Sequence, residues 1–449
     1  MKLLNGAFRH PEISVQELGT RNEINNRTFL NIPGPRIRST KFFVSVLSLI
    51  SGLTSLTSLP LFIYQKSHLK LSPSTILTFA GIASLPWSFK PLFGLLFDIY
   101  IERKGSIRMI LLINSFCKIG IFISLFLFRP STYVILLILC LESLFDLIEN
   151  IVSEYMLVIL GKNDDQKNNL PIYYGFRALG SLIGTFLGGR LLEYKIAGLP
   201  FLICAITTFI GFVVALFFKE QRSGRQVVST GTSIQFREKF AVMVDFVKRP
   251  GTLKLIFLVL LVNMTPSFDS VFTFFMTDGL RFSMSDLSNF QTFGTICYLI
   301  GLLLYYFYLT GVNPRNFFMG TNFLVLLVNI SFGLVVAGTI KSWGVDERLF
   351  CMLNQGFSAL VSELNFMPLL EVWTKNCPPG LEATSVTVLT GLINLSVSGS
   401  SWVGAMILNL GRLEDITRPT LLKLLLIQNA YLLLASLVVI LVPFPKKEE

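Results

Sequence analysis

The chain is built almost entirely from apolar segments that are each long enough to cross a lipid bilayer. A spanning helix needs about 20 predominantly apolar residues. Of the 449 residues, 52% are hydrophobic and only 14% are charged. We therefore predict an all-α polytopic membrane protein with twelve transmembrane helices. The predicted spans are 41–63, 73–97, 106–128, 131–160, 171–192, 196–218, 252–277, 284–309, 314–338, 346–373, 380–408 and 419–443.

The longest polar interruption, residues 219–251, divides these spans into two sets of six. We predict an N-terminal six-helix bundle at 41–218, a basic cytoplasmic linker at 219–251 and a C-terminal bundle at 252–443. A disordered N-terminal tail (1–40) and a short C-terminal tail (444–449) complete the chain. Two such halves are typical of the major facilitator fold, in which they rock about a central site.

The positive charge of the chain follows its predicted topology. With the N-terminus placed in the cytoplasm, 24 of the 38 Lys and Arg residues fall on the cytoplasmic side and 11 on the other. Cytoplasmic loops carry such an excess, so both termini are predicted to be cytoplasmic. The net charge of +11 is thus explained by the topology of the chain in the membrane. We expect a lipid bilayer as partner and no nucleic acid.

The fourth span carries more acid than lipid accepts: Glu142, Asp146, Glu149 and Glu154. An acid at the centre of a spanning helix raises the free energy of membrane insertion by about 2.5–3.5 kcal/mol, whereas each Leu, Ile, Val or Phe lowers it by only about 0.3–0.6 kcal/mol. These carboxylates must lie near the helix ends, be protonated, or face a watery cavity or cationic partners. We place Asp146 and Glu149 on a cavity that forms a solute pathway.

Two cations accompany these acids. Arg177 is the one arginine deep in a predicted span and cannot lose its proton. Its anion is either an acid of the fourth span (Asp146, Glu149 or Glu154) or a carboxylate of the solute, and the sequence leaves both open. Lys118, on the third span, either pairs with one of the acids or extends to the membrane surface.

Several motifs, spread in order over about residues 86–400, are similar to those of the folate-biopterin transporters, a branch of the major facilitator superfamily. The second span ends in a Lys-Pro pair followed by a glycine, an aspartate and a basic loop, and a Cys-Pro-Pro-Gly-Leu-Glu run precedes the eleventh span. The residues that carry the resemblance are Lys90, Pro91, Gly94, Asp98 and Arg103, the glycine-rich run 175–180, Pro266, and Cys377, Pro378, Gly380 and Glu382.

The resemblance implies a secondary active transporter that moves folates, pterins or related small solutes by alternating access, with protons as a candidate coupling ion. A same-fold transporter of an amino-acid-like or nucleoside-like solute, and a non-transporting receptor or scaffold, remain alternatives. An enzyme is not expected, because no HExxH or GxSxG motif occurs. We expect no cofactor, no metal and a monomer. The plasma membrane is the default location, and an organellar membrane stays open.

Further predictions concern a gate and the second half. Asp98 either gates the cytoplasmic mouth by meeting Arg103 or merely marks the membrane surface. In the second half, Glu363 is predicted to face the cavity, whereas Asp269 lies on the cavity or at the outer rim. Pro91 and Pro266 predict a kinked second helix and a broken seventh helix. Three phenylalanines are candidates for stacking on a flat ring: Phe176, Phe272 and Phe274.

Overall fold

The computed structural model describes residues 37–102, 105–128, 130–163, 170–194, 198–218, 241, 243–309, 312–375 and 382–441. Within these ranges the chain is helical and contains no β-strand. Each of the predicted apolar segments falls on helix, because a backbone in lipid must satisfy its hydrogen bonds within the segment. The predicted N-terminal tail lies outside the described residues up to position 36.

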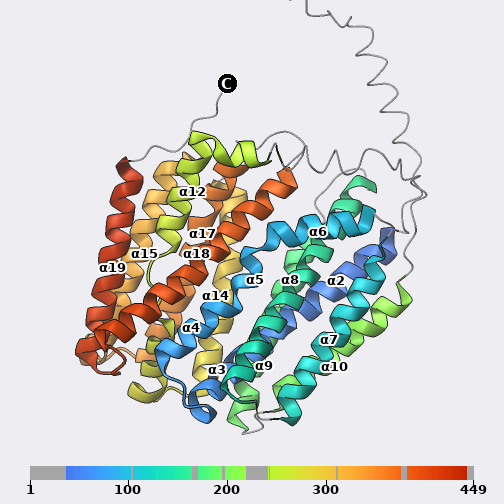
Figure 1. The fold of residues 1–449 in the computed structure, drawn as a ribbon. Coiled ribbons are helices and arrows are strands. Elements are labelled where there is room, and N and C mark those ends of the chain that lie inside the picture. Colours follow the sequence, from blue (N-terminus) through green and yellow to red (C-terminus); the bar gives the residue numbers. More distant parts are fainter. Residues whose placement is uncertain are drawn as a thin grey trace, which may run out of the picture.

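The first half is a bundle in which successive helices run up and down (Figure 1). Its first helix is interrupted by a 3₁₀ turn and ends in a π-helix. Its second is divided into three pieces. In chain order the elements are α2 (Ile37–Leu53), η1 (Thr54–Thr57), α3 (Ser58–Ile63), η2 (Tyr64–His68), α4 (Pro73–Ala83), α5 (Leu85–Ser88), α6 (Lys90–Glu102), α7 (Ile107–Leu127), α8 (Thr132–Asn163), α9 (Leu170–Glu193) and α10 (Leu199–Phe217).

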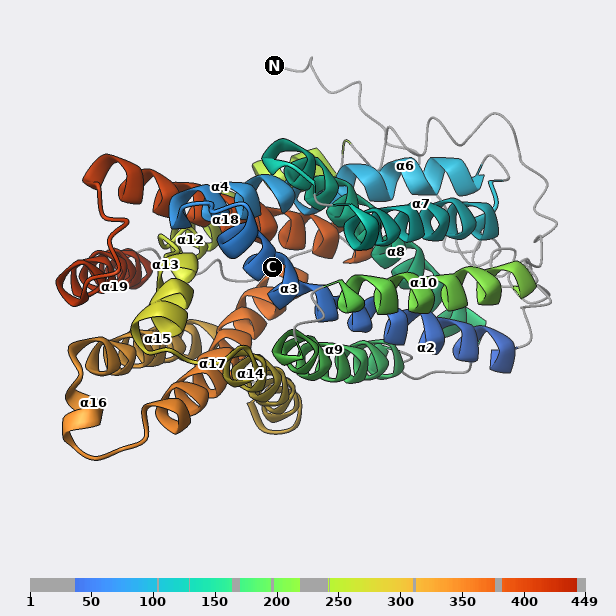
Figure 2. The ribbon, with the colours of Figure 1, turned by 90° about the horizontal axis from the view of Figure 1, so that it is seen from below.

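The second half has the same up-and-down arrangement, and Figure 2 shows it beside the first half. Its first helix is again broken and again ends in a π-helix. The elements are α12 (Pro250–Asn263), α13 (Asp269–Phe274), η3 (Phe275–Gly279), α14 (Met284–Leu304), η4 (Tyr305–Leu309), α15 (Pro314–Ala337), α16 (Thr339–Ser342), α17 (Glu347–Lys375), α18 (Glu382–Gly411) and α19 (Arg418–Leu441).

By length and composition, the described residues contain eight helices that could cross a membrane. The four other predicted spans fall on α8, α9, α17 and the broken α12–η3. Of these, α8 is long enough but carries the acids discussed above, and α12 is apolar but shorter. The class of fold is thus confirmed, and the count of twelve spans stays a prediction.

Prolines break the helices where the sequence predicts it. Pro91 is the second residue of α6 and Pro86 the second residue of α5, so the second span bends before each of them. In the seventh span α12 ends at Asn263, and Pro266 lies in the non-helical stretch before α13. Both predictions are confirmed, and their cause is the missing N–H of proline.

Helix α18 satisfies the backbone groups that this break exposes. The Ser267 N–H donates to the Ser400 carbonyl at 3.2 Å, and the Ser400 hydroxyl donates to the Thr265 carbonyl. Gly404 allows the approach, because a Cβ at this position would overlap the Ser267 carbonyl oxygen. A neighbouring helix therefore stabilises irregular backbone at membrane depth.

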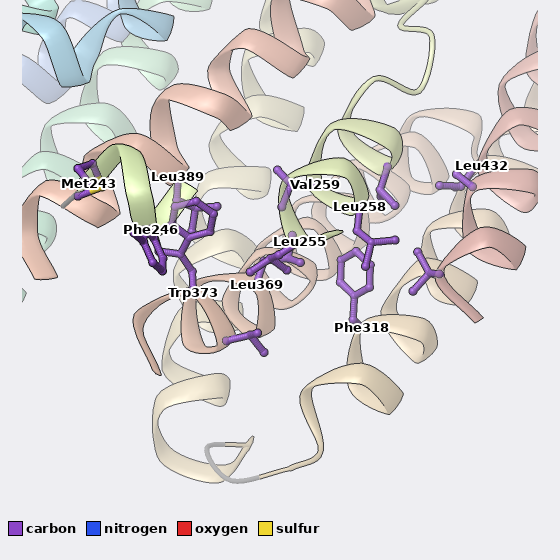
Figure 3. Packing of buried hydrophobic residues seen from close by; sticks show 14 residues of the cluster. Met243, Phe246, Leu255, Leu258, Val259, Phe318, Leu369, Trp373, Leu389 and Leu432 are labelled. Atoms are coloured by element: carbon purple, nitrogen blue, oxygen red, sulfur yellow. The ribbon is translucent and has the colours of Figure 1, made fainter. Parts of the chain in front are cut away.

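Each half has its own hydrophobic core. In the second half, the end of the predicted linker contributes to it: residues 243–248 are helical, and Phe246 packs edge-on against the buried Trp373 (Figure 3). In the first half, the core includes Phe43, Leu111 and Leu147 from three different helices. Residues 219–240 of the linker lie outside the described residues, and the domain boundaries stay predictions.

The most extensive contacts between the halves join α9 with α14 and the α4–α6 helix with α18. At the first contact, Gly189 packs against Ser288, whose hydroxyl donates to the Thr185 carbonyl. At the second, the Ser84 and Ser398 hydroxyls lie 2.7 Å apart. Small side chains at these positions let the helices approach closely.

A structural repeat relates the two halves. After η2 and after η3, the chain turns through a basic residue with positive φ, Lys70 (52°) in the first half and Arg281 (56°) in the second. The next helix then begins after a serine N-cap, Ser72 or Ser283, whose side chain accepts from the backbone. The same turn therefore closes the first helix of both halves.

Candidate functional site

A buried lysine connects two acids of α8. Lys118, on α7, is only 1% exposed, and its Nζ lies 2.7 Å from Asp146 Oδ1 and 2.7 Å from Glu149 Oε2. The two acids can share one cation because residues three apart lie on the same face of a helix. The prediction that Lys118 has an acidic partner is confirmed, and it has two. Glu142, one turn before Asp146, is also buried.

A second lysine pairs with the last acid of α8. Lys90, on α6, is 6% exposed, and its Nζ lies 2.8 Å from Glu154 Oε1. We had predicted Lys90 only as part of a gating motif. The missed signal is that a lysine within a span needs an acidic partner when it cannot reach water.

Arg177 does not contact the acids of α8 that the sequence offered as its partners. Its Nη1 donates to the Tyr173 hydroxyl at 3.2 Å, and Asn150 Nδ2 donates to the same oxygen at 2.9 Å. Among the described residues, no Asp or Glu oxygen lies within 4.0 Å of its guanidinium, whereas Asp146, Glu149 and Glu154 each contact a lysine. Tyr173, which is fully buried, was not predicted from the sequence.

Arg177 and the exposed apolar side chains of α9 lie on different faces of this helix. Phe176, Leu179 and Ile183 are exposed. At about 100° per residue, Leu179 lies about 160° around the helix from Arg177. The apolar face is therefore the one suited to lipid, and Arg177 points toward the interior of the bundle. Phe176 belongs to the apolar face rather than to a ring-stacking site.

In the second half, Glu363 is buried at 4% exposure on α17. The hydroxyl of Tyr298, on α14, hydrogen-bonds its carboxylate. No Lys, Arg or His nitrogen of the described chain lies within 4.0 Å of this carboxylate. Gly301 makes the contact between the helices close, because a Cβ there would lie 3.4 Å from Glu363 Cβ. The sequence predicted Glu363 but not Tyr298.

Asp269 is the first residue of α13, directly after the proline break. It is exposed, and its carboxylate accepts from the Ser267 hydroxyl at 3.0 Å. Ten residues separate it from Gly279, which at 1.5 Å per residue is about 15 Å of helix. Asp269 is therefore separated from the outer end of the seventh span by this length of helix, and its place on the cavity or at the rim stays a prediction.

The remaining predicted residues are only partly described. The Asp98 side chain, Arg103, Cys377, Pro378 and Gly380, and the Glu382 side chain lie outside the described residues. Gly94 has open space around its Cα, and the Pro91 ring packs beside Gly391 of α18. Phe272 and Phe274 are buried against other aromatic rings, Phe332 and Phe62 respectively, so both serve packing.

Solved structures with the same architecture identify the fold. The chain superposes on the nucleoside transporter NupG with a TM-score of 0.70 at 13% identity, covering 91% of this chain and 100% of that one. A structure of proton-dependent oligopeptide transporters gives 0.66 at 13% identity, with coverage of 90% and 97%. The helical bundle with charged residues inside it therefore has the major facilitator fold.

The sequence matches place the chain more narrowly. The model of the BT1 family matches residues 51–448, and the chain belongs to this family. Folate transporter 2 of Plasmodium falciparum is 24% identical over 91% of this chain and 89% of its own length. The folate-biopterin transporter of Synechocystis is 23% identical over 86% of this chain and 78% of its own length. The predicted family resemblance is confirmed.

Proposed function

We propose that this protein is a secondary active transporter of folate- or pterin-class solutes that works by alternating access and couples transport to protons. The observation that carries the proposal is Arg177, an arginine inside the bundle with no carboxylate partner among the described residues. Guanidinium binds carboxylates bidentately. The names of the relatives, which include folate and folate-biopterin transporters, supply the class of solute.

The charges of the first half give a scheme for coupling. Lys118 and Arg177 carry two positive charges, and Asp146 and Glu149 carry two negative charges, so these four side chains, counted without the neighbouring Glu142, are neutral in the absence of solute. An anionic solute on Arg177 adds a negative charge, which one added proton balances. Keeping the group neutral in both states avoids the cost of an uncompensated charge in a low-dielectric interior.

Asp146 is the acid best suited to take that proton. Its side chain is 27% exposed, compared with 8% for Glu149. If Asp146 is protonated, Lys118 still keeps Glu149 as its partner. In this proposal Asp146, one of the two acids that contact Lys118, is therefore the coupling group.

Alternating access is supported by contacts between the halves at the end of the bundle away from Ile37 and Leu441. Lys66, in η2, bonds Asp278 and Thr277 in η3, and its ammonium lies 4.5 Å from the Phe274 ring centroid. The equivalent turns of the two halves thus hold this end together. We propose that this end faces away from the cytoplasm, with both termini cytoplasmic and the plasma membrane as location.

Uptake of labelled folate and pterin into vesicles, with and without a pH gradient, tests the proposal. We expect saturable uptake that rises when the compartment from which solute enters is made acidic. A panel of nucleosides, amino acids and peptides in the same assay identifies a different solute. Absence of saturable flux for every compound would contradict the proposal and favour a receptor.

A further inference from the structure

The contacts between α9 and α14 place Arg177 at the same depth as a group in the other half. The Thr185 and Thr292 hydroxyls lie 3.2 Å apart, and Gly189 packs against Ser288 one turn away. The two helices run antiparallel, so moving eight residues back from Thr185 corresponds to moving eight residues on from Thr292. Arg177 is therefore level with Ile300, about 12 Å along the helices from the threonine contact.

Ile300 lies between the two residues that contact Glu363. Tyr298 bonds the Glu363 carboxylate, and Gly301 packs against its Cβ. Arg177 and Glu363 thus share one level of the membrane on opposite halves. Each lacks an ion-pair partner in the described chain, although the other interior cations, Lys90 and Lys118, are paired.

Tyr298 lies on the polar flank of α14. At about 100° per residue, Gln291, Thr295 and Tyr298 fall between the face that contacts α9 and the face that contacts α17. The opposite flank carries apolar exposed side chains: Ile296, Ile300 and Leu303. A helix exposes its apolar flank to lipid, so the polar flank faces the interior between the halves. Tyr298 is 43% exposed there.

We propose that Arg177 and the Glu363–Tyr298 pair bind the two ends of one solute, with the first half taking a carboxylate and the second half taking N–H donors. The acceptor oxygens of Glu363 and Tyr298 suit an amino or ring N–H group. The matching class is a solute with an acidic tail and a donor-rich ring, as in a carboxylated pterin. The inference rests on the proposed function, which supplies the class of solute. It adds an assignment of each end of the solute to one half of the protein.

The test uses purified full-length protein and two fragments, N-(4-aminobenzoyl)glutamate for the acidic end and pterin for the ring end. Thermal stabilisation against concentration gives a Kd for each fragment. We expect Arg177→Gln to weaken N-(4-aminobenzoyl)glutamate binding at least about tenfold and to leave pterin unchanged, since a charged hydrogen bond is lost. Glu363→Gln should do the reverse.

Matched controls are Arg190→Gln and Glu193→Gln, at the exposed end of α9, which should change neither Kd. Should Arg177→Gln not fold, Arg177→Lys keeps the charge but loses the bidentate geometry and should show the same selectivity. Equal weakening of both fragments by either site variant, or binding of neither fragment to the wild type, would overturn the two-ended site. Binding of both fragments without folate flux would overturn the proposed transport and leave this site standing.

Discussion

The two halves close their first helices with the same turn but hold their charges differently. In the first half, buried lysines reach across to α8 and make ion pairs at 2.7–2.8 Å. In the second half, interior bonds between spans join neutral side chains, such as Asn365 to Asn322 at 2.7 Å and Asn354 to Ser331 at 2.6 Å. An ion pair between its spans, Arg348 with Asp286 at 3.6 Å, lies at the helix ends, where Arg348 is exposed. Glu363 bonds a tyrosine there rather than a cation.

This difference indicates a division of labour. Ion pairs in a low-dielectric interior can take up or release a proton while their neighbours keep the charge balanced. A carboxyl group held only by a neutral hydroxyl keeps oxygen acceptors available for the N–H donors of a ligand. We therefore assign coupling to the first half, together with anion recognition by Arg177, and donor recognition to the second half.

The largest expected effect follows from removing the shared cation. Lys118→Met leaves the buried Glu149 and the half-buried Asp146 without their counter-ion, and breaking a buried ion pair in this way costs about 3–5 kcal/mol. We expect a large loss of folded protein and a lower Tm in detergent. The triple variant Lys118→Met, Asp146→Asn, Glu149→Gln should recover most of this stability. Lys341→Met, at an exposed position, is the control. A Tm unchanged by Lys118→Met would show that the ion pairs do not stabilise the first half.

A smaller effect is expected from Tyr173→Phe. The substitution removes the oxygen that accepts from both Arg177 and Asn150, so Arg177 is less well positioned. A hydrogen bond of about 1 kcal/mol corresponds to roughly a fivefold change in KM. We expect that increase for folate and none for neutral pterin. Equal increases for both solutes would assign Tyr173 a purely structural role.

The smallest effect concerns the contact between the equivalent turns. Asp278→Asn weakens the bond to Lys66 at an exposed position, where ion pairs are worth about 0.2–1 kcal/mol. We expect the halves to separate at this end about 1.4- to fivefold more often. Alkylation of a cysteine introduced at Thr273 reports the opening, with Asp415→Asn, at an exposed position between α18 and α19, as the matched control. Unchanged alkylation would mean that Lys66 does not hold this end closed.

The sequence predicted the helices well because each span is set by a local property, the length of an apolar segment. It also predicted the breaks at Pro91 and Pro266, since proline acts on its own helix. The repeat of the η2 and η3 turns was missed. The similarity between these turns consists of Leu69, Lys70 and Ser72 in the first half and Leu280, Arg281 and Ser283 in the second. This similarity is too small to notice without the backbone.

Pairings between helices were less predictable. An acidic partner for Lys118 was one of two alternatives offered by the sequence, whereas none was foreseen for Lys90, whose partner Glu154 is 64 residues away. The sequence also offered the acids of α8 as partners for Arg177, and the described structure shows none of these pairs. The reason is competition: which cation reaches an acid depends on how α6, α7 and α9 pack around α8. The roles of Asp146, Glu149, Arg177 and Glu363 stay proposals.

The most direct test of the division of labour is folate uptake by Asp146→Asn vesicles with and without an imposed pH gradient. In the wild type, the proposed coupling predicts faster uptake when the side from which folate enters is acidified. Asp146→Asn mimics the protonated acid. We predict uptake by this variant that is saturable and independent of the gradient. Full retention of the wild-type response to the gradient would contradict the account.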